Sequence, residues 1–218
     1  MQLSVSEFAE ARGVSRQRAL ALISAGQVKA QRVGRSWVID QQEVNRRAAR
    51  GRPLSARMAE LIIHAMSGDV PERLDPQERF FLGKYVDRLR RDESPLELLH
   101  SWLRSRQIRV VDVGANPADI PEIAADRRAV ASGISDPRAG MSAAREFEGY
   151  IEAADLERFL RDNLLVESAS LNVRLHVVGR KPADPVPLGL IIADLADWNR
   201  PREDGRALDL MRGVSWPH

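Results

Sequence analysis

The sequence predicts an α+β protein in which a small N-terminal domain precedes a larger one. Residues 1–49 contain two short helical patterns followed by two strand-like segments around a glycine, and residues 56–106 are helical in periodicity. In residues 107–218, strand-like and helical segments intermix without a regular βαβ repeat, which favours α+β over α/β. Residues 50–55, with the sequence RGRPLS, would form the linker.

Capping signals mark the first two helices. Ser4 and Glu7 form an S-x-x-E capping box, so a helix should start directly after Ser4. Gly13 can adopt the left-handed conformation that ends this helix, and Ser15 is placed to cap a second helix over Arg16–Ser24. The buried positions of the two helices would be Val5, Phe8, Ala9, Ala19, Leu20, Leu22 and Ile23. Two short helices in this arrangement form a helix-turn-helix.

The start of the second helix is a candidate DNA-reading surface, because recognition helices present the side chains of their first turn to base edges. This turn carries four polar residues, Ser15, Arg16, Gln17 and Arg18. We therefore expect these four side chains to contact DNA.

A hairpin should follow the second helix. Residues 28–33 and 36–39 are strand-like segments on either side of Gly34 and Arg35. Arg32, Arg35 and Ser36 would lie near the tip of this wing, where they can meet phosphate groups or the minor groove. The first 49 residues are thus predicted to form a winged helix-turn-helix.

The linker and the segment before it are basic. Asp40 and Glu43 predict a third helix from Gln41 to about Ala49. The following Arg50-Gly51-Arg52-Pro53 matches the core of an AT-hook, in which arginines enter a narrow A·T minor groove. Arg50 and Arg52 are therefore candidate DNA contacts. The alternative is a basic linker punctuated by glycine and proline, without groove insertion.

Charge divides the chain in the same place. Residues 1–55 hold ten basic and four acidic side chains, a net charge of +6, whereas the remaining residues hold 23 basic and 27 acidic side chains, a net charge of −4. A basic head on a mildly acidic body fits a head that binds nucleic acid and a body that does not.

Three helices are predicted in residues 56–106. They should cover Ala56–Met66, the segment after the Asp75-Pro76-Gln77-Glu78 capping box to about Arg91, and Ser94–Arg106. The inward residues of the second helix would be Phe81, Leu82, Tyr85, Val86 and Leu89. Its opposite face carries a basic row of Lys84, Arg88 and Arg91, which is either a solvated face or a contact for DNA or an acidic partner.

The last part of the chain alternates between helix and strand. Strands are expected over residues 108–113, 129–134, 146–151 and 171–178. Helices are expected from Asn116-Pro117, over Asp155–Asn163 and over Arg202–Arg212, with a buried apolar segment at residues 188–195.

The sequence offers few signs of catalytic or metal chemistry. It has no cysteine, and its four histidines lack metal-ligand spacing. Phosphate-cradling, nucleophile-elbow and zinc-protease motifs are missing, so we expect no enzymatic activity, no cofactor and no metal. One acidic group, formed by Asp194, Asp197, Glu203 and Asp204, could hold magnesium for nuclease chemistry, although helix capping and solvation also explain it.

No apolar run reaches the length of a membrane span and no signal segment opens the chain, which indicates a cytoplasmic protein.

The N-terminal residues resemble those of the excisionase and MerR-like winged-helix DNA-binding domains. The resemblance rests on Phe8-Ala9, Gly13-Val14-Ser15, Ala25-Gly26-Gln27-Val28 and Arg32-Val33-Gly34-Arg35-Ser36-Trp37-Val38-Ile39. It covers about the first quarter of the chain and implies binding to double-stranded DNA. The alternative is a domain of this fold that serves only as a scaffold for protein contacts.

The whole chain is similar to actinobacterial regulators of the AbiEi antitoxin type. Besides the head and linker, the similar residues are Ser101–Arg106, Glu148-Gly149-Tyr150-Ile151, Ala193-Asp194-Leu195-Ala196, Pro201-Arg202 and Ala207-Leu208-Asp209-Leu210. The resemblance implies a transcriptional repressor that is also the antitoxin of a nucleotidyltransferase-type toxin encoded by an adjacent gene. Its partners would be operator DNA and that toxin. Because the operators of helix-turn-helix proteins are commonly palindromic, a second copy in a homodimer is a further expected partner. Two alternatives remain: an excisionase-like recombination factor, for which residues 56–218 are more than the task needs, and an enzyme that its head targets to DNA.

Overall fold

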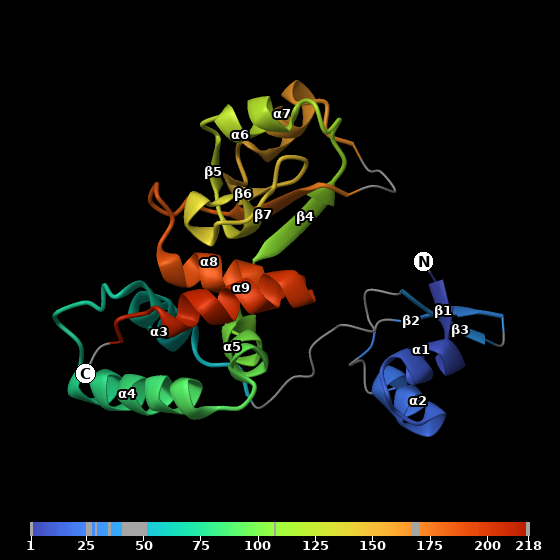
Figure 1. The fold of residues 1–218 in the computed structure, drawn as a ribbon, viewed down its shortest axis with the longest axis horizontal. Coiled ribbons are helices and arrows are strands. Elements are labelled where there is room, and N and C mark those ends of the chain that lie inside the picture. Colours follow the sequence, from blue (N-terminus) through green and yellow to red (C-terminus); the bar gives the residue numbers. More distant parts are fainter. Residues whose placement is uncertain are drawn as a thin grey trace. The chain divides into compact units, whose positions relative to one another are not determined.

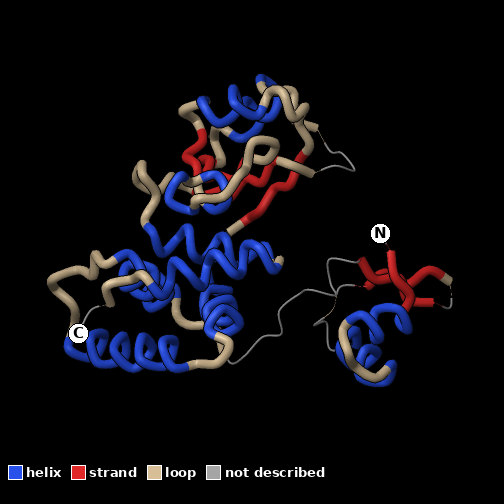
Figure 2. Tube along the Cα trace, viewed as in Figure 1, coloured by secondary structure: helices blue, strands red, loops and turns tan. Residues whose placement is uncertain are grey.

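Mixed helices and sheets place the protein in the α+β class, as predicted (Figures 1 and 2). The structure is a computed structural model that describes residues 2–24, 28, 30–34, 36–40, 52–106, 108–166 and 171–216. The chain divides into two compact units, Met1–Arg50 and Gly51–His218. Each unit has its own hydrophobic core.

The first unit begins with a short strand that the sequence did not predict. Strand β1 (Gln2–Ser4) runs into helix α1 (Val5–Ala11), and helix α2 (Arg16–Ser24) follows after a short turn. The predicted capping box is confirmed: the Ser4 hydroxyl accepts a hydrogen bond from the Glu7 N–H, and the Glu7 carboxylate accepts one from the Ser4 N–H. Gly13 adopts the expected left-handed conformation, with φ of 66°.

The predicted hairpin is present as strands β2 (Ala30–Val33) and β3 (Ser36–Asp40), joined through Gly34, whose φ is 61°. Strand β1 pairs with the other side of β3, which gives a three-stranded antiparallel sheet of order β1-β3-β2. Helix α1 packs against both α2 and the sheet. The small core consists of Leu3, Val5, Phe8, Ala9, Ala19, Ile23, Val28 and Ile39. The helix predicted over residues 41–49 lies outside the described residues.

The second unit starts with three helices near their predicted positions. They are α3 (Ala56–Ser67), α4 (Pro76–Arg91) and α5 (Pro95–Leu103), and a 3₁₀ turn over Arg104–Arg106 ends the last of them. The prediction was wrong for Phe81, which is 39% exposed, as is its neighbour Phe80 at 57%. The core side of α4 is formed by Leu82, Val86 and Leu89. These residues follow one another at i, i+4 and i+7 and share one face of the helix, whereas Phe81 lies beside that face.

A four-stranded mixed sheet follows, made of β4 (Arg109–Val113), β5 (Ala129–Ala131), β6 (Phe147–Glu152) and β7 (Val173–Val178). Its order is β4-β7-β6-β5, in which only β6 and β7 run parallel. Helix α7 (Leu156–Asp162) connects this parallel pair, and helix α6 (Ile120–Ala125) lies between β4 and β5 in the chain. The helix expected to open at Asn116-Pro117 begins only at Ile120, because the Asn116 side chain accepts the Ala118 N–H in a turn.

The chain closes with helices α8 (Leu188–Trp198) and α9 (Pro201–Arg212), which pack on the helices that open the unit. Figure 2 shows the two layers that result: α3, α4, α5, α8 and α9 on one side, and the sheet with α6 and α7 on the other. One face of the sheet buries Phe147, Ile151 and Leu175 against α6 and α7. The other face turns Val130 and Tyr150 toward the helical layer.

One ion pair ties the turn before β5 to α7. Arg128 donates hydrogen bonds to Asp126 from its backbone N–H and its guanidinium, which also reaches Asp162 at 2.7 Å. The hydrogen bonds from the Arg128 side chain are the largest cause of a lowered Asp126 pKa, to about 2.

The ion pair between Asp126 and Arg128 should make part of the stability depend on pH. A depressed carboxyl pKa stabilises the fold above the pKa of the unfolded chain, about 3.9, and the contribution is lost as pH falls toward 2. We expect Asp126→Asn to lower the free energy of unfolding by about 2 kcal/mol at neutral pH and by less at pH near 3. Urea titrations at both pH values measure the difference, with Glu157→Gln on the exposed side of α7 as control. A deficit that is the same at both pH values would contradict the assignment.

Candidate functional site

The first turn of α2 gathers four of the predicted DNA contacts. The Ser15 hydroxyl accepts a hydrogen bond from the Arg18 N–H at 3.1 Å, which fixes the start of the helix. Ser15, Arg16, Gln17 and Arg18 are all exposed, while Ala19 and Ile23 on the other side are buried against α1. The helix end therefore presents two guanidinium groups, an amide and a hydroxyl to its surroundings.

The hairpin carries the second group of predicted contacts. Arg32 and Ser36 are exposed. Arg32 lies opposite Trp37 on the neighbouring strand, with its guanidinium carbon 6.0 Å from the centre of the indole ring. Val33 is 57% exposed beside the turn. Arg35 lies outside the described residues.

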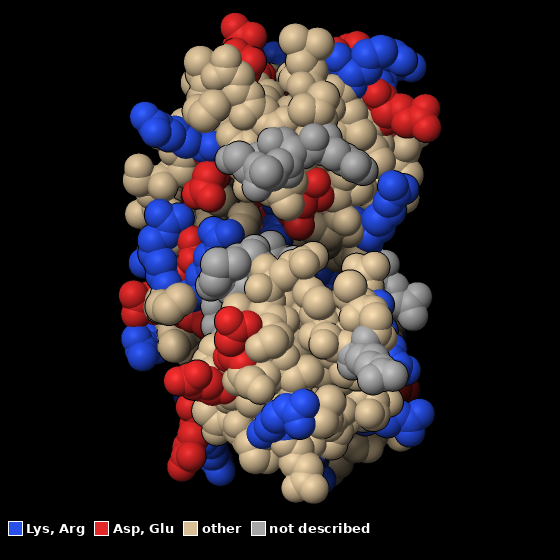
Figure 3. Space-filling view, turned by 90° about the vertical axis from the view of Figure 1, so that its right-hand side faces the viewer, with Lys and Arg blue, Asp and Glu red and all other residues tan. Residues whose placement is uncertain are grey.

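The linker contributes one described candidate, Arg52, which is exposed. Arg50, the other half of the AT-hook-like pattern, lies outside the described residues. Basic and acidic side chains lie interspersed on the face drawn in Figure 3. The described candidates for phosphate contacts are therefore individual arginines on α2, on the hairpin and in the linker.

The predicted acidic group does not come together as one site. Asp194 is buried, Asp197 lies 3.0 Å from a nitrogen of His100, and Glu203 pairs with Arg202 at 2.9 Å. Within the described residues, no group of three or more His, Asp and Glu side chains is arranged to hold a metal ion. These carboxylates serve hydrogen bonds and ion pairs inside the second unit.

Sequence reasoning missed a buried polar network between the sheet and α8. Glu148 on β6 is fully buried, and its Oε1 lies 2.9 Å from Nε2 of His176 on β7. Its Oε2 accepts hydrogen bonds from the Ile134 N–H at 3.0 Å and from the Trp198 indole N–H at 2.8 Å. Gly133 is needed beside it, because a Cβ there would lie 1.8 Å from Oε2.

A second carboxylate, Asp194 on α8, anchors the other half of this network. It accepts hydrogen bonds from the Ser132 hydroxyl at 2.5 Å and from the Tyr150 hydroxyl at 2.8 Å. The Tyr150 oxygen in turn accepts a hydrogen bond from Nη2 of Arg106 at 3.0 Å, and the Tyr150 ring stacks on the His176 ring with centroids 4.9 Å apart. We call these residues, Arg106, Ser132, Glu148, Tyr150, His176 and Asp194, the buried network.

Burial and neighbouring charges shift the pKa values of three members of the buried network. Burial, followed by the charge of Glu148, raises the pKa of Asp194, although the nearby His176 opposes the shift. Burial alone would lower the pKa of His176, but the charge of Asp194 and the hydrogen bond to Glu148 outweigh it and raise that pKa. Burial raises the pKa of Tyr150 strongly, so its hydroxyl remains a neutral donor. The network thus combines two carboxyl groups with a guanidinium and with an imidazole whose charged form is favoured.

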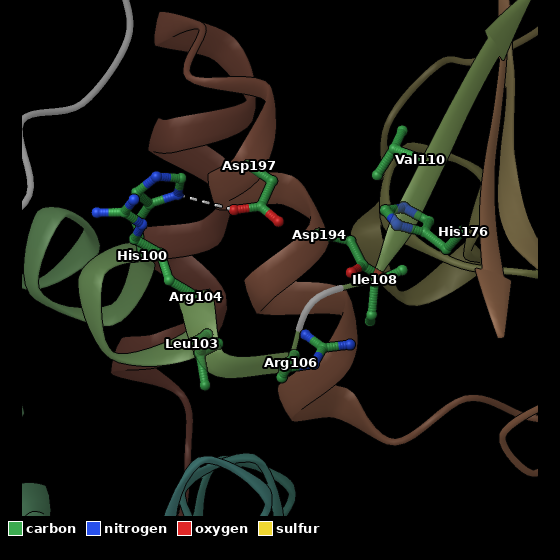
Figure 4. Close-up of a pocket in the computed structure, with 9 residues that line it drawn as sticks. All are labelled: His100, Leu103, Arg104, Arg106, Ile108, Val110, His176, Asp194 and Asp197. Atoms are coloured by element: carbon green, nitrogen blue, oxygen red, sulfur yellow. Dashed lines mark hydrogen bonds and ion pairs between the residues drawn. The ribbon is translucent and has the colours of Figure 1, made fainter. Parts of the chain in front are cut away.

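The network opens onto a cavity of about 160 Å³ inside the second unit. Figure 4 shows it between the segment that follows α5, strands β4 and β7, and helix α8. A signal for this site was present in the sequence, since Glu148 and Tyr150 alternate with the apolar residues of β6 and His176 stands between Leu175 and Val177. A polar stripe on a strand that is buried on both faces indicates an internal site.

Comparisons of the chain with protein-family models, with curated proteins and with solved structures find no match. In the part of the chain that the structure describes, no helix has both the length and the apolar character needed to cross a membrane. The contacts described above are therefore the basis on which a function can be assigned.

Proposed function

We propose that this chain is a sequence-specific double-stranded DNA-binding protein that regulates transcription, and that its first unit is a winged helix-turn-helix. The observation that carries the proposal is the capped first turn of α2, which leaves Arg16, Gln17 and Arg18 exposed on a helix packed by its other side. Arginine and glutamine are the side chains that pair bidentately with guanine and adenine in the major groove.

The hairpin supports the same proposal. A recognition helix fixes its register on DNA through additional contacts to the backbone, and an exposed arginine on a neighbouring element supplies them. Arg32 on β2 is such a residue, and its cross-strand contact with Trp37 holds the side chain at the edge of the sheet. The net charge of +6 in residues 1–55 adds long-range attraction to phosphate.

The two groups of contacts should behave differently under mutation. We expect Arg16→Ala and Gln17→Ala to remove about 1 to 3 kcal/mol of discrimination between the preferred site and scrambled DNA. Arg32→Ala should weaken binding to both DNAs by a similar factor, because a phosphate contact carries no sequence information. Duplexes selected from a random library by the full chain supply the preferred site, and fluorescence anisotropy gives both affinities.

Arg158→Ala serves as the matched control, since it removes the same charge from an exposed position on α7 in the second unit. It should leave both affinities unchanged. Equal losses on specific and scrambled DNA for all of the first-unit variants would refute α2 as the recognition helix. DNA binding that none of these variants alters would refute the first unit as the DNA-binding part, and the absence of sequence-specific binding by the full chain would refute the proposal as a whole.

We further propose, from the resemblance to AbiEi-type regulators, that the second unit contacts a cognate toxin. The support within the structure is an exposed aromatic pair on α4, where Phe80 and Phe81 meet edge to face at 5.5 Å and Lys84 lies 4.5 Å from the Phe80 ring. Exposed aromatic residues of this kind are enriched at protein interfaces. Coexpression with the product of the adjacent gene tests this role. We expect the wild type to rescue growth and the double variant Phe80→Ala/Phe81→Ala to lose this rescue. Failure of the wild type to rescue growth would overturn the proposal.

A further inference from the structure

The cavity beside the buried network has a size and a lining that suit a small ligand group. Its volume of about 160 Å³ lies between α5, the 3₁₀ turn after it, the sheet and α8. Since an apolar cavity of about 150 Å³ can hold one benzene ring, the space fits a few heavy atoms rather than a drug-sized molecule. Leu103, Ile108 and Val110 form an apolar side, and His176, Asp194 and Arg106 form the polar one.

The two carboxylates that line this cavity already accept hydrogen bonds from the protein. One oxygen of Asp194 accepts from Ser132 and the other from Tyr150. Asp197 at the mouth lies 3.0 Å from His100, the pair joined by the dashed line in Figure 4. These carboxylates are therefore held toward donors of the protein itself, and each oxygen can accept one further hydrogen bond.

The donors, by contrast, are not all used. His176 is 3% exposed and bonds Glu148 through Nε2, and its Nδ1 has no partner among the described residues. Arg106 gives one hydrogen bond from Nη2 to Tyr150, and its other N–H groups have no acceptor in the described part of the chain. Figure 4 shows both side chains on the wall of the cavity. Both side chains border the cavity, so these nitrogens can be reached by an acceptor from solvent or from a ligand.

The protonation of His176 decides what the cavity offers. The groups that face the imidazole are Glu148 and Tyr150 on β6, Asp194 and Asp197 on α8, and Arg106 after α5. Burial by itself would lower the pKa of His176, but Asp194, Glu148 and Asp197 outweigh it and raise that pKa, which favours the imidazolium form with a proton on both nitrogens. In this form Nδ1 is a charged donor beside the guanidinium of Arg106.

We propose that this cavity binds a small oxyanion, a carboxylate or a phosphate group, between Nδ1 of His176 and the guanidinium of Arg106. The exposed Arg104 adds a further positive charge at the mouth, and the apolar side receives the remainder of the ligand. Charge-assisted hydrogen bonds from a fixed guanidinium and imidazolium are the usual means of holding such groups. The site is separate from the DNA contacts proposed for the first unit, so each can fail without the other.

The full-length chain tests the site with inorganic phosphate and acetate as probes, at constant ionic strength and with chloride as reference. Binding is read from the imidazole signals of His176 in NMR spectra and from the shift in melting temperature. Saturable changes with phosphate alone assign a phosphate ligand, and changes with acetate alone assign a carboxylate. Absence of any saturable change at the His176 ring with either probe overturns the proposal.

Two variants locate the binding. Arg106→Lys keeps the charge but removes the planar fork, and Arg104→Gln changes only the exposed mouth, so at least one variant should fold. We expect the affinity to fall by about tenfold or more for Arg106→Lys, as expected for a lost charge-assisted hydrogen bond, and by less for Arg104→Gln. Arg158→Gln is the control for charge. Affinities that match the wild type in both cavity variants would place the anion elsewhere and refute the site.

The pH dependence of anion binding to the wild-type protein is an independent test of the site. As pH rises through the raised pKa of His176, Nδ1 loses its proton while Nε2 keeps the hydrogen bond to Glu148. Nδ1 then presents a lone pair to the anion, so binding should weaken on the alkaline side. A flat affinity across the His176 titration, followed by NMR, would contradict the role of this imidazole.

Discussion

Binding of the full chain to duplex DNA should weaken by about 10²- to 10³-fold when salt rises from about 50 to about 200 mM, if four to six phosphates are contacted. Each arginine that meets a phosphate releases condensed counterions, and the first unit and the linker offer Arg16, Arg18, Arg32, Arg35, Arg50 and Arg52. The logarithm of the association constant should fall linearly with the logarithm of the salt concentration.

Fluorescence anisotropy over a salt series measures this slope. Arg52→Ala should make the slope less steep by roughly one unit if the linker contacts phosphate, and Arg158→Ala should leave it unchanged. The comparison also separates the two interpretations of the linker, because an arginine that does not reach DNA alters neither slope nor affinity. A slope near zero for the wild type would exclude the phosphate contacts proposed here.

The second large effect is expected on stability. Gly189→Ala should lower the free energy of unfolding by about 3 kcal/mol or more and the melting temperature by about 6 to 12 °C. Gly189 lies in α8, where a Cβ would come within 2.1 Å of the Ile63 carbonyl oxygen on α3. A backbone atom cannot rotate away as a side chain can, so the two helices would have to separate.

Gly205→Ala is the matched control in the neighbouring helix α9. Its Cβ would meet nothing within 4 Å, and alanine is the better helix former, so a gain of about 0.5 to 1 kcal/mol is expected. Thermal and urea denaturation compare the two variants. Equal effects would show that the close approach of α3 and α8 is unimportant for stability.

Local signals in the sequence predicted the helices well. The capping boxes at Ser4 and Asp75 mark helix starts that the structure confirms, because a cap depends on residues only three positions apart. Strand β1 was missed, since Gln2–Ser4 is too short to show periodicity and is held only by its pairing with β3. The apolar run that begins at Leu188 was expected to be buried, and the sequence left its type open because such runs fit both helix and strand.

The buried network could not be assembled from the sequence. Its members come from separate segments, and the bond between Ser132 and Asp194 spans 62 positions. The apolar neighbours of His176 indicate burial, but only the parallel register of β6 and β7 places Tyr150 opposite it. In the first unit, by contrast, the candidate DNA contacts sit within one helix turn and one hairpin, where spacing in the sequence reflects spacing in the structure.

The packing of α3 and α5 on α8 has a consequence for how the protein is made. The core that these helices share includes Leu61 and Leu98 from the early part of the chain and Ile192 and Ala207 from near its end. A ribosome adding about 5 to 20 residues per second needs several seconds to synthesise the intervening hundred or so residues. During that time the apolar sides of α3 and α5 lack their partner, so the newly made second unit should depend on chaperones until α8 and α9 emerge.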